Sequence, residues 1–380
     1  MAKKNKSKKV RVAFRKNRSK RVRESDFTRK FKKDELDHDQ LTSGERVSGK
    51  GDISRKRTIH GVELVESDSG TTVHLEVDRT KCIAGRVLKV QGLVSEVMAE
   101  DEQVYHCATR RLLKTLATDQ RHVVAAGDRV WIRTAVNNEG IIESVEPRYG
   151  VLSRASKNRQ HVIVANVDQL LIITSAGQPT IKPNLIDRYI VTAEKAGIRP
   201  VICINKIDLV DPADLQPLAG VYGQMGYEVL LLSATDNIGI DRLRELLKDR
   251  ESVLSGQSGV GKSTLLNAIE PGLQLRVAAV SSGTDKGRHT TTTAALVPLS
   301  TGGDVVDTPG IRQFQLWDVI PEEVAGYFRD IRPLINSCKF PNCSHTHEND
   351  CAVKHAVADG YLDTRRYESF CQIQAGEMEN

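Results

Sequence analysis

The sequence contains few aromatic residues and no long hydrophobic run. Phe, Trp and Tyr make up 4% of its 380 residues. A membrane-spanning helix needs about 20 consecutive, mostly apolar residues, and a secretory signal needs an apolar core that the N-terminal segment lacks. We therefore expect a cytoplasmic protein that neither spans a membrane nor is secreted.

Acidic residues are almost missing from the first 33 positions. This segment holds sixteen Lys and Arg against Glu24 and Asp26, a net charge of +14, whereas the whole chain has +6 and the remainder is therefore −8. A segment so charged cannot bury enough apolar surface to fold alone, so we expect a disordered basic arm. We favour nucleic-acid binding as the role of this arm over that of a solubilising tail, because counterion release favours binding to a polyanion.

Short alternating β-type runs predict a small barrel over residues 81–150. Residues 1–80 are expected to be the basic arm and a linker, with at most a short strand near 71–77. The predicted barrel strands are 85–90, 93–100, 103–108, 129–134 and 140–147. Five such strands are typical of an OB-type barrel, a scaffold that often binds oligonucleotides; a purely structural β-domain is the alternative.

Strands and helices alternate over residues 151–317, which predicts a doubly wound α/β domain. The predicted strands are 169–175, 200–206, 228–234, 251–256 and 303–310, and the predicted helices are 184–196, 240–249 and 262–269. Ligands of such domains bind at the carboxyl ends of the strands. Residues 318–380 predict a mostly helical module, with helices at 321–335, 352–358 and 362–373, which is too small to fold without a staple.

The stretch 256-GQSGVGKST-264 matches the pattern GxxxxGK[ST] between a predicted strand and a predicted helix. Backbone amides of such a loop surround phosphates, Lys262 reaches the β- and γ-phosphates, and Ser263 is the predicted magnesium ligand. The candidate phosphate-binding residues are Gly256, Gln257, Ser258, Gly259, Val260, Gly261, Lys262, Ser263 and Thr264.

Guanine-reading residues lie upstream of this loop. In 205-NKID-208, Asp208 can accept both guanine hydrogens at N1 and N2, which adenine does not offer. Lys206 can lie along the purine face, and Asn205 can tie the two loops together. In 233-SA-234, the Ala234 amide can face the guanine O6. GTP and GDP are therefore the expected ligands, with a P-loop kinase or ATPase as the alternative.

A predicted γ-phosphate sensor follows in 307-DTPG-310. Asp307 can hold magnesium through a water, and the Gly310 amide can sense the γ-phosphate. The threonine-rich stretch 281–296 is the expected switch loop. Any of its threonines at 290–293 can be the magnesium ligand, and we favour Thr291 or Thr292.

A Cys/His cluster in 338-CKFPNCSHTHENDC-351 predicts one structural zinc site. Seven cysteines, an odd number without a secretion signal, favour metal ligands or free thiols over a disulfide framework. Three thiolates and one imidazole form a closed tetrahedral site. The candidate thiolates are Cys338, Cys343 and Cys351, and three histidines compete for the nitrogen position: His345, His347 and His355.

These GTPase motifs occur in rotated order, with the guanine readers before the phosphate loop. This order, between a β-barrel and a Cys/His module, resembles the circularly permuted GTPases that depend on the small ribosomal subunit, the RsgA/YjeQ family. The resemblance covers about residues 81–375, includes 187-DRY-189 and 287-GRHTTT-292, and selects His345 as the zinc ligand. It implies a monomeric GTP hydrolase that binds the rRNA of the small ribosomal subunit late in its assembly, uses hydrolysis to time release, and is slow alone.

The residue that orients the attacking water differs from Ras-like enzymes. Ile311 stands where those enzymes have a glutamine, and Ile311 cannot orient water. His289, in the expected switch loop, is the candidate catalytic residue, as the resembled family implies for this position. An RNA-binding assembly chaperone in which GTP is mainly a conformational ligand is the alternative function.

Overall fold

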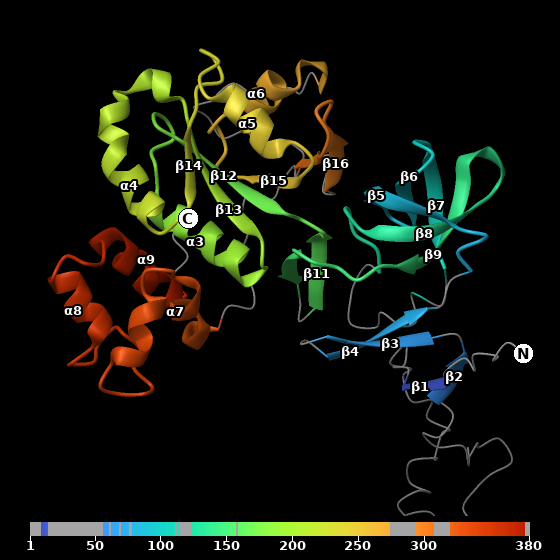
Figure 1. Ribbon diagram of the computed structural model, residues 1–380, viewed down its shortest axis with the longest axis horizontal. Helices are drawn as coiled ribbons and strands as arrows, with labels where there is room; N and C mark the ends of the chain where they lie inside the picture. The colour runs from blue at the N-terminus through green and yellow to red at the C-terminus, as the bar shows by residue number, and fades with distance from the viewer. Residues whose placement is uncertain are drawn as a thin grey trace, which may run out of the picture.

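The computed structural model describes the barrel, the α/β core and the C-terminal module, together with short strands near the N-terminus (Figure 1). The described residues are 9–13, 56–60, 62–67, 70–75, 78–110, 113, 123–156, 159–273, 294–307 and 320–376. In Figure 1 the core lies between the barrel and the C-terminal module, so each of these two units contacts a different side of the core.

The predicted barrel is confirmed. Its strands are β5 (Ile83–Gln91), β6 (Val94–Ala99), β7 (Val104–Thr109), β8 (Arg129–Thr134) and β9 (Glu139–Val145). Pairing of β5 with β8 closes the barrel. Alternate residues of these strands, among them Val97 and Ile132, are buried in its interior, as the period of two in a strand requires.

The core sheet is parallel except at one edge. Strand β12 (Gln169–Ser175) pairs in parallel with β13 (Arg199–Asn205) on one side and with β15 (Glu251–Ser255) on the other. Strand β14 (Glu228–Leu231) pairs with the outer edge of β13, and β17 (Asp304–Asp307) pairs with the outer edge of β15. Strand β16 (Ala295–Pro298) pairs antiparallel with the other edge of β17. A single residue pair, Ala295 with Lys89, continues this sheet into the barrel.

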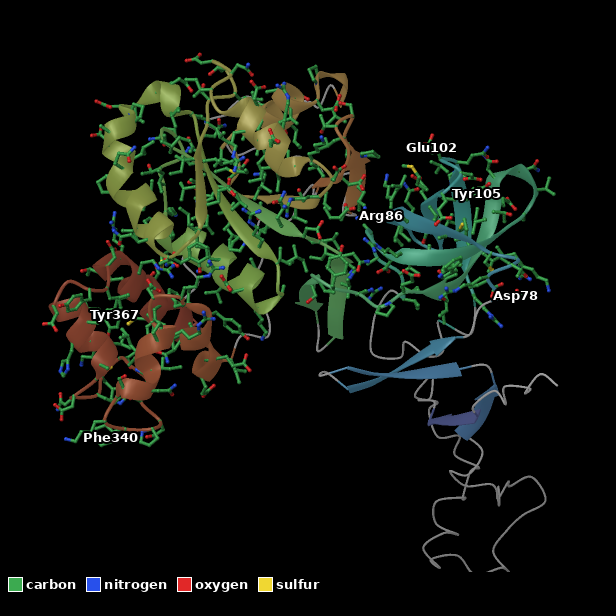
Figure 2. All side chains as sticks on the ribbon, viewed as in Figure 1. Asp78, Arg86, Glu102, Tyr105, Phe340 and Tyr367 are labelled. Carbon is green, nitrogen blue, oxygen red and sulfur yellow. The ribbon has the colours of Figure 1, made fainter. Side chains whose placement is uncertain are left out.

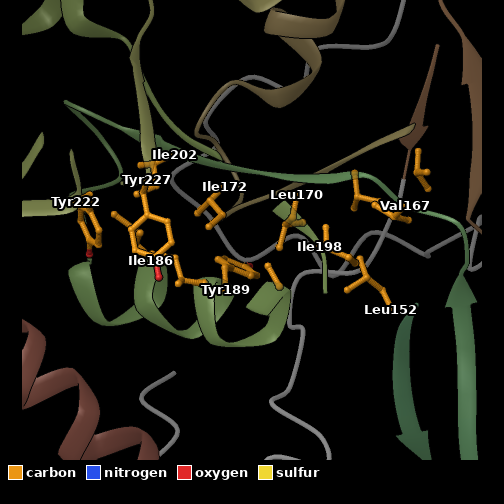
Figure 3. Close-up of a cluster of buried hydrophobic side chains, with 14 of the residues drawn as sticks. Leu152, Val167, Leu170, Ile172, Ile186, Tyr189, Ile198, Ile202, Tyr222 and Tyr227 are labelled. Carbon is orange, nitrogen blue, oxygen red and sulfur yellow. The ribbon is translucent and has the colours of Figure 1, made fainter. Parts of the chain in front are cut away.

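Helices cover both faces of the core sheet. The helices α3 (Pro183–Lys195) and α4 (Gln216–Gln224) share one hydrophobic cluster with the sheet, and α5 (Ile240–Leu247) and α6 (Lys262–Ile269) share the other. Figure 3 shows Ile186 and Tyr189 of α3 packed under Leu170 and Ile172 of β12. Burial on both faces explains why β12 reads as a continuous apolar run.

Three strand pairs were not expected from the sequence. The region expected to hold at most one short strand contains the hairpin β3 (Val62–Ser67) with β4 (Gly70–Leu75). Strand β2 (Lys56–His60) pairs with β1 (Lys9–Ala13), and β1 falls within the expected basic arm. A further hairpin, β10 (Leu152–Ser156) with β11 (Arg159–Val164), precedes the core. Val and Thr favour paired strands even in a polar segment, and this preference outweighed the turn signals.

The expected helix over 321–335 was wrong, because the chain breaks there. It forms the 3-10 turn η7 (Pro321–Glu323), the short α7 (Val324–Tyr327) and the 3-10 turn η8 (Arg332–Ser337). The break falls at Phe328, whose backbone is extended. Its ring is fully buried and packs edge-on against Phe370, with 5.7 Å between the two ring centroids. The later helices, α8 (Ala352–Ala358) and α9 (Thr364–Gln374), match the predicted ones. Within the described residues, no helix combines the length and the apolar character that a membrane span requires.

A buried arginine joins the C-terminal module to the core. Arg366 of α9 is 1% exposed and makes an ion pair with Asp187 of α3, which is 0% exposed. Arg366 also donates two hydrogen bonds to Asp330, at 2.9 and 3.0 Å. Tyr222 of α4 donates to the same Asp187 carboxylate at 2.9 Å. Because both charges are removed from water, each depends on the other to remain buried.

We expect Arg366→Met to weaken docking of the C-terminal module by about 3–5 kcal/mol, the usual result of removing one partner from a buried ion pair. Burial already raises the pKa of Asp187, so an uncompensated carboxyl is neutralised at low pH, and the loss should shrink as pH falls. The measurement is a urea titration followed by hydrogen exchange of the α9 amides. Arg365→Met is the matched control, since Arg365 pairs with Asp363 at the surface and should cost less than about 1 kcal/mol. Equal losses for the two variants would contradict the prediction.

Candidate nucleotide site and metal cluster

The predicted phosphate loop joins the end of β15 to the start of α6. Gly256 has φ 149°, and a Cβ there would lie 2.0 Å from the carbonyl oxygen of Ile173, so only glycine fits. The Lys262 ammonium donates to the carbonyl oxygens of Gly256 and Gln257, both at 2.7 Å. The loop therefore curls around the lysine at the N-terminus of α6, where backbone amides and the helix dipole favour a phosphate.

The predicted guanine-reading segment is bonded directly to this loop. The Asn205 side chain is at the end of β13, is 2% exposed, and donates from Nδ2 to the Val260 carbonyl at 2.9 Å. Lys206, in a left-handed backbone conformation, donates from Nζ to the Gly259 carbonyl at 2.7 Å. A Cβ at Gly261 would lie 2.4 Å from Asn205 Nδ2, so close approach of the two loops requires this glycine.

The carboxylate that is predicted to read guanine is held in place by a serine that follows the neighbouring strand, β14. Asp208 is exposed in the 3-10 turn η4 (Ile207–Leu209), and its Oδ1 accepts a hydrogen bond from Ser233 Oγ at 2.6 Å. Ser233 is fully buried, and its Oγ also accepts from the Asp236 amide at 3.2 Å. This network sets the direction of the Asp208 carboxylate and places Ala234 beside it.

The predicted sensor strand reaches the same edge of the sheet. Strand β17 runs parallel to β15 and ends at Asp307, so the carboxyl ends of both strands lie together. The Asp307 side chain and the other predicted site residues here lie outside the described residues, and their roles stay predictions. These residues are His289, Thr291, Thr292 and Gly310.

One contact of the site was missed from the sequence. The Lys206 ammonium also donates to the Gln178 carbonyl at 2.7 Å, from the loop that follows β12. The sequence feature that could have indicated this contact is the position of the loop at the carboxyl end of a buried parallel strand, because ligands bind at that edge of such sheets. The Lys206 ammonium thus connects the loop after β12 with the phosphate loop.

The four predicted zinc ligands come together in the C-terminal module. The ligand atoms of Cys338, Cys343, His345 and Cys351 all lie within 4.8 Å of one another. Cys338 Sγ lies 3.3 Å from His345 Nδ1 and 3.8 Å from Cys351 Sγ. Zinc–sulfur bonds of about 2.3 Å in a tetrahedron place sulfur atoms at such separations, so the residues fit a structural zinc ion.

The choice of histidine is also explained by the structure. His345 is 5% exposed within the cluster, whereas His347 is exposed and its Nδ1 bonds to Ser344 and Thr346. Burial lowers the pKa of His345, which keeps its imidazole neutral, the form that binds a metal. Burial raises the pKa of the Cys343 thiol to about 12, so a cation is needed to hold it as thiolate at neutral pH.

Comparison with known proteins agrees with this geometry. A family model described as RsgA GTPase matches residues 145–317. The small ribosomal subunit biogenesis GTPase RsgA of Shewanella oneidensis is 35% identical over 346 residues, which cover 88% of this chain and 95% of that protein. The chain belongs to the RsgA GTPase family. The protein of the same description from Chlorobaculum tepidum is 41% identical over 303 residues, covering 77% of this chain and 97% of that one.

Solved structures of the RsgA type share the fold. The crystal structure of YjeQ from Thermotoga maritima has a TM-score of 0.65 at 34% identity, covering 77% of this chain and 98% of that chain. The structure of YloQ, a circularly permuted GTPase, has a TM-score of 0.62 at 31% identity, covering 77% and 94%. The predicted fold class is thereby confirmed, and this RsgA-family chain is a GTPase.

We expect one zinc ion per chain, measured by elemental analysis of protein purified without a metal-affinity tag. Cys343→Ser should abolish zinc binding and lower the melting temperature, because the small C-terminal module loses its staple. Cys371→Ser is the control: Cys371 lies in α9 outside the four-ligand cluster, and this variant should keep its zinc. Zinc retained by Cys343→Ser, or absent from the wild type, would contradict the assignment.

Proposed function

We propose that this protein is a GTP hydrolase that acts late in assembly of the small ribosomal subunit, binds its rRNA, and uses hydrolysis to time its release. One observation carries the nucleotide part: the Asn205 amide and the Lys206 ammonium bond the guanine-reading segment to the phosphate loop. The partner is supported by relatives named for small ribosomal subunit biogenesis.

The base is read by groups that the fold already orients. Asp208, directed by Ser233, accepts hydrogen bonds from guanine N1 and N2, whereas adenine offers no matching donors. The stem of Lys206 covers one face of the purine, and the Ala234 amide donates to the guanine O6. These contacts select GTP and GDP over ATP.

The phosphates bind at the start of α6. Loop amides and Lys262 contact the β- and γ-phosphates. Ser263, Asp307 and a threonine at 291 or 292 would hold magnesium, which neutralises charge that develops on the phosphate oxygens. In our proposal the Gly310 amide senses the γ-phosphate, so the conformation of this segment differs between GTP and GDP.

The attacking water needs an orienting group, since the isoleucine at 311 has none. We assign this role to His289, whose imidazole accepts or donates a hydrogen bond and can hold water in line with the γ-phosphate. The free enzyme is then slow until its switch loop is positioned by a partner. The rRNA is the proposed source of that positioning, with the basic arm, the barrel and the zinc module as its contacts.

We expect small ribosomal subunits to raise the GTP turnover number at least tenfold at low salt, because binding orders the switch loop. The measurement is phosphate release with and without purified subunits, with large subunits as the control. A tenfold excess of ATP should leave the rate unchanged, which excludes a kinase or ATPase site.

Absence of stimulation, with binding intact, would instead favour the assembly chaperone in which GTP is a conformational ligand. The sequence observation behind this second function is Ile311, which stands in the position of the usual glutamine.

We expect His289→Ala to lower GTP turnover at least tenfold while GTP affinity changes little, because the group acts on water and not on bound nucleotide. His106→Ala is the control, since His106 is exposed on barrel strand β7 and should not affect turnover without subunits. Turnover of His289→Ala within about twofold of wild type would remove the catalytic assignment.

A further inference from the structure

Two carboxylates face each other where the core sheet meets the barrel. Glu251 begins β15 and Asp304 begins β17, and their Cα atoms are direct partners in the parallel ladder. A third carboxylate, Asp168, precedes β12 and accepts a hydrogen bond from the Glu251 amide at 2.8 Å. The side chains of Glu251 and Asp304 are only 13% and 15% exposed. Like charges directly opposite on neighbouring strands destabilise a sheet, and burial increases that effect.

The barrel supplies the opposite charge at this edge. Arg86 of β5 lies at the side of the barrel that faces the core (Figure 2). Its Nη1 donates to Asp304 Oδ2 at 2.7 Å and makes an ion pair with Glu251 Oε1. Arg129 of β8 is the Cα partner of Arg86 and stacks near Tyr149, with its guanidinium 5.8 Å from the ring centroid. In the core, the two carboxylates repel each other at this edge, and in the barrel Arg86 lies beside Arg129. The ion pairs of Arg86 with Glu251 and Asp304 offset the repulsion between the carboxylates.

The ladder that Arg86 stabilises is short. Strands β15 and β17 pair through three residue pairs, and Glu251 with Asp304 is the first of them. Glu251 Oε2 and Arg86 Nε are buried without a hydrogen-bond partner among the described residues, so the charge contact itself compensates for their burial. At its other end, β15 enters the phosphate loop, and β17 ends at Asp307.

We propose that Arg86 is a positioning residue for GTP hydrolysis. From the barrel it neutralises Glu251 and Asp304, and thereby keeps the phosphate-loop strand and the sensor strand in register. The catalytic alignment of the core thus depends on a side chain of another domain. A shift of about 1 Å between the two strands is enough to slow a reaction that relies on positioning.

The first test compares Arg86→Met with Arg133→Met in GTP hydrolysis without subunits. Arg133 is the control, because it is an arginine of the same barrel whose ion pair with Glu143 stays within the barrel domain and does not reach the core. Arg86→Met should lower kcat about tenfold while KM for GTP stays within about threefold, since β12 still pairs with β15 and Asn205 still bonds to Val260. Arg133→Met should match wild type. A wild-type kcat for Arg86→Met would overturn the proposal.

The second test removes the repulsion instead of the cation. The triple variant Arg86→Met, Glu251→Gln, Asp304→Asn has no unpaired charge in this ladder and should recover kcat to within about threefold of wild type. A triple variant about tenfold slower than wild type would overturn the proposal, because Arg86 would then act through packing and not through charge. This comparison also decides the question if Arg86→Met alone does not fold.

The pH profile separates charge from packing. Burial raises the pKa of Asp304, and Arg86 opposes that rise; without Arg86, protonation of the carboxyl pair relieves the repulsion. The kcat deficit of Arg86→Met relative to wild type should therefore shrink as pH falls from about 8 to about 5.5. Asp168, Arg129 and Tyr149 face the same cluster and are unchanged in both proteins. A deficit independent of pH would count against neutralisation.

Discussion

The predicted nucleotide site is organised by a hydrogen bond from the Asn205 amide to the Val260 carbonyl at 2.9 Å, which the bond from Lys206 to the Gly259 carbonyl reinforces. The Asn205 bond links two loops that follow strands on opposite sides of β12. Asn205 is buried, so loss of its partner would leave a polar group unsatisfied in the interior, which is costly. The predicted guanine-reading segment and the phosphate loop are therefore held together as one unit, although they belong to separate stretches of the chain.

The permuted order gives the C-terminal module two connections to this unit. The chain reaches the module after β17, and the module is also held to α3 through the ion pair of Arg366 with Asp187. Helix α3 follows β12 and packs under it. The module is therefore tied to the core both through the chain that follows β17 and through α3.

Local sequence patterns predicted the features that depend on residues close together in the chain. Period-two alternation identified the barrel strands, and the glycine spacing in 256–264 identified the phosphate loop. The pattern could not identify contacts such as Arg86 with Asp304, which are 218 positions apart, because nothing in either local sequence specifies the partner. The helix expected over 321–335 failed for a related reason: the burial of Phe328 against Phe370, a tertiary contact, outweighed helix propensity.

The position of the phosphate loop has a consequence for biosynthesis. A ribosome makes the barrel before the core, then β12 to β14 with the predicted guanine readers, and only later β15 and the loop that begins at Gly256. Domains generally fold in the order in which they emerge. The nascent chain therefore cannot bind GTP at this site until β15 and the loop after it have been translated, and β12 must wait for β15 to cover its second edge. Nucleotide binding thus marks a nascent chain whose barrel and first core strands have already been made.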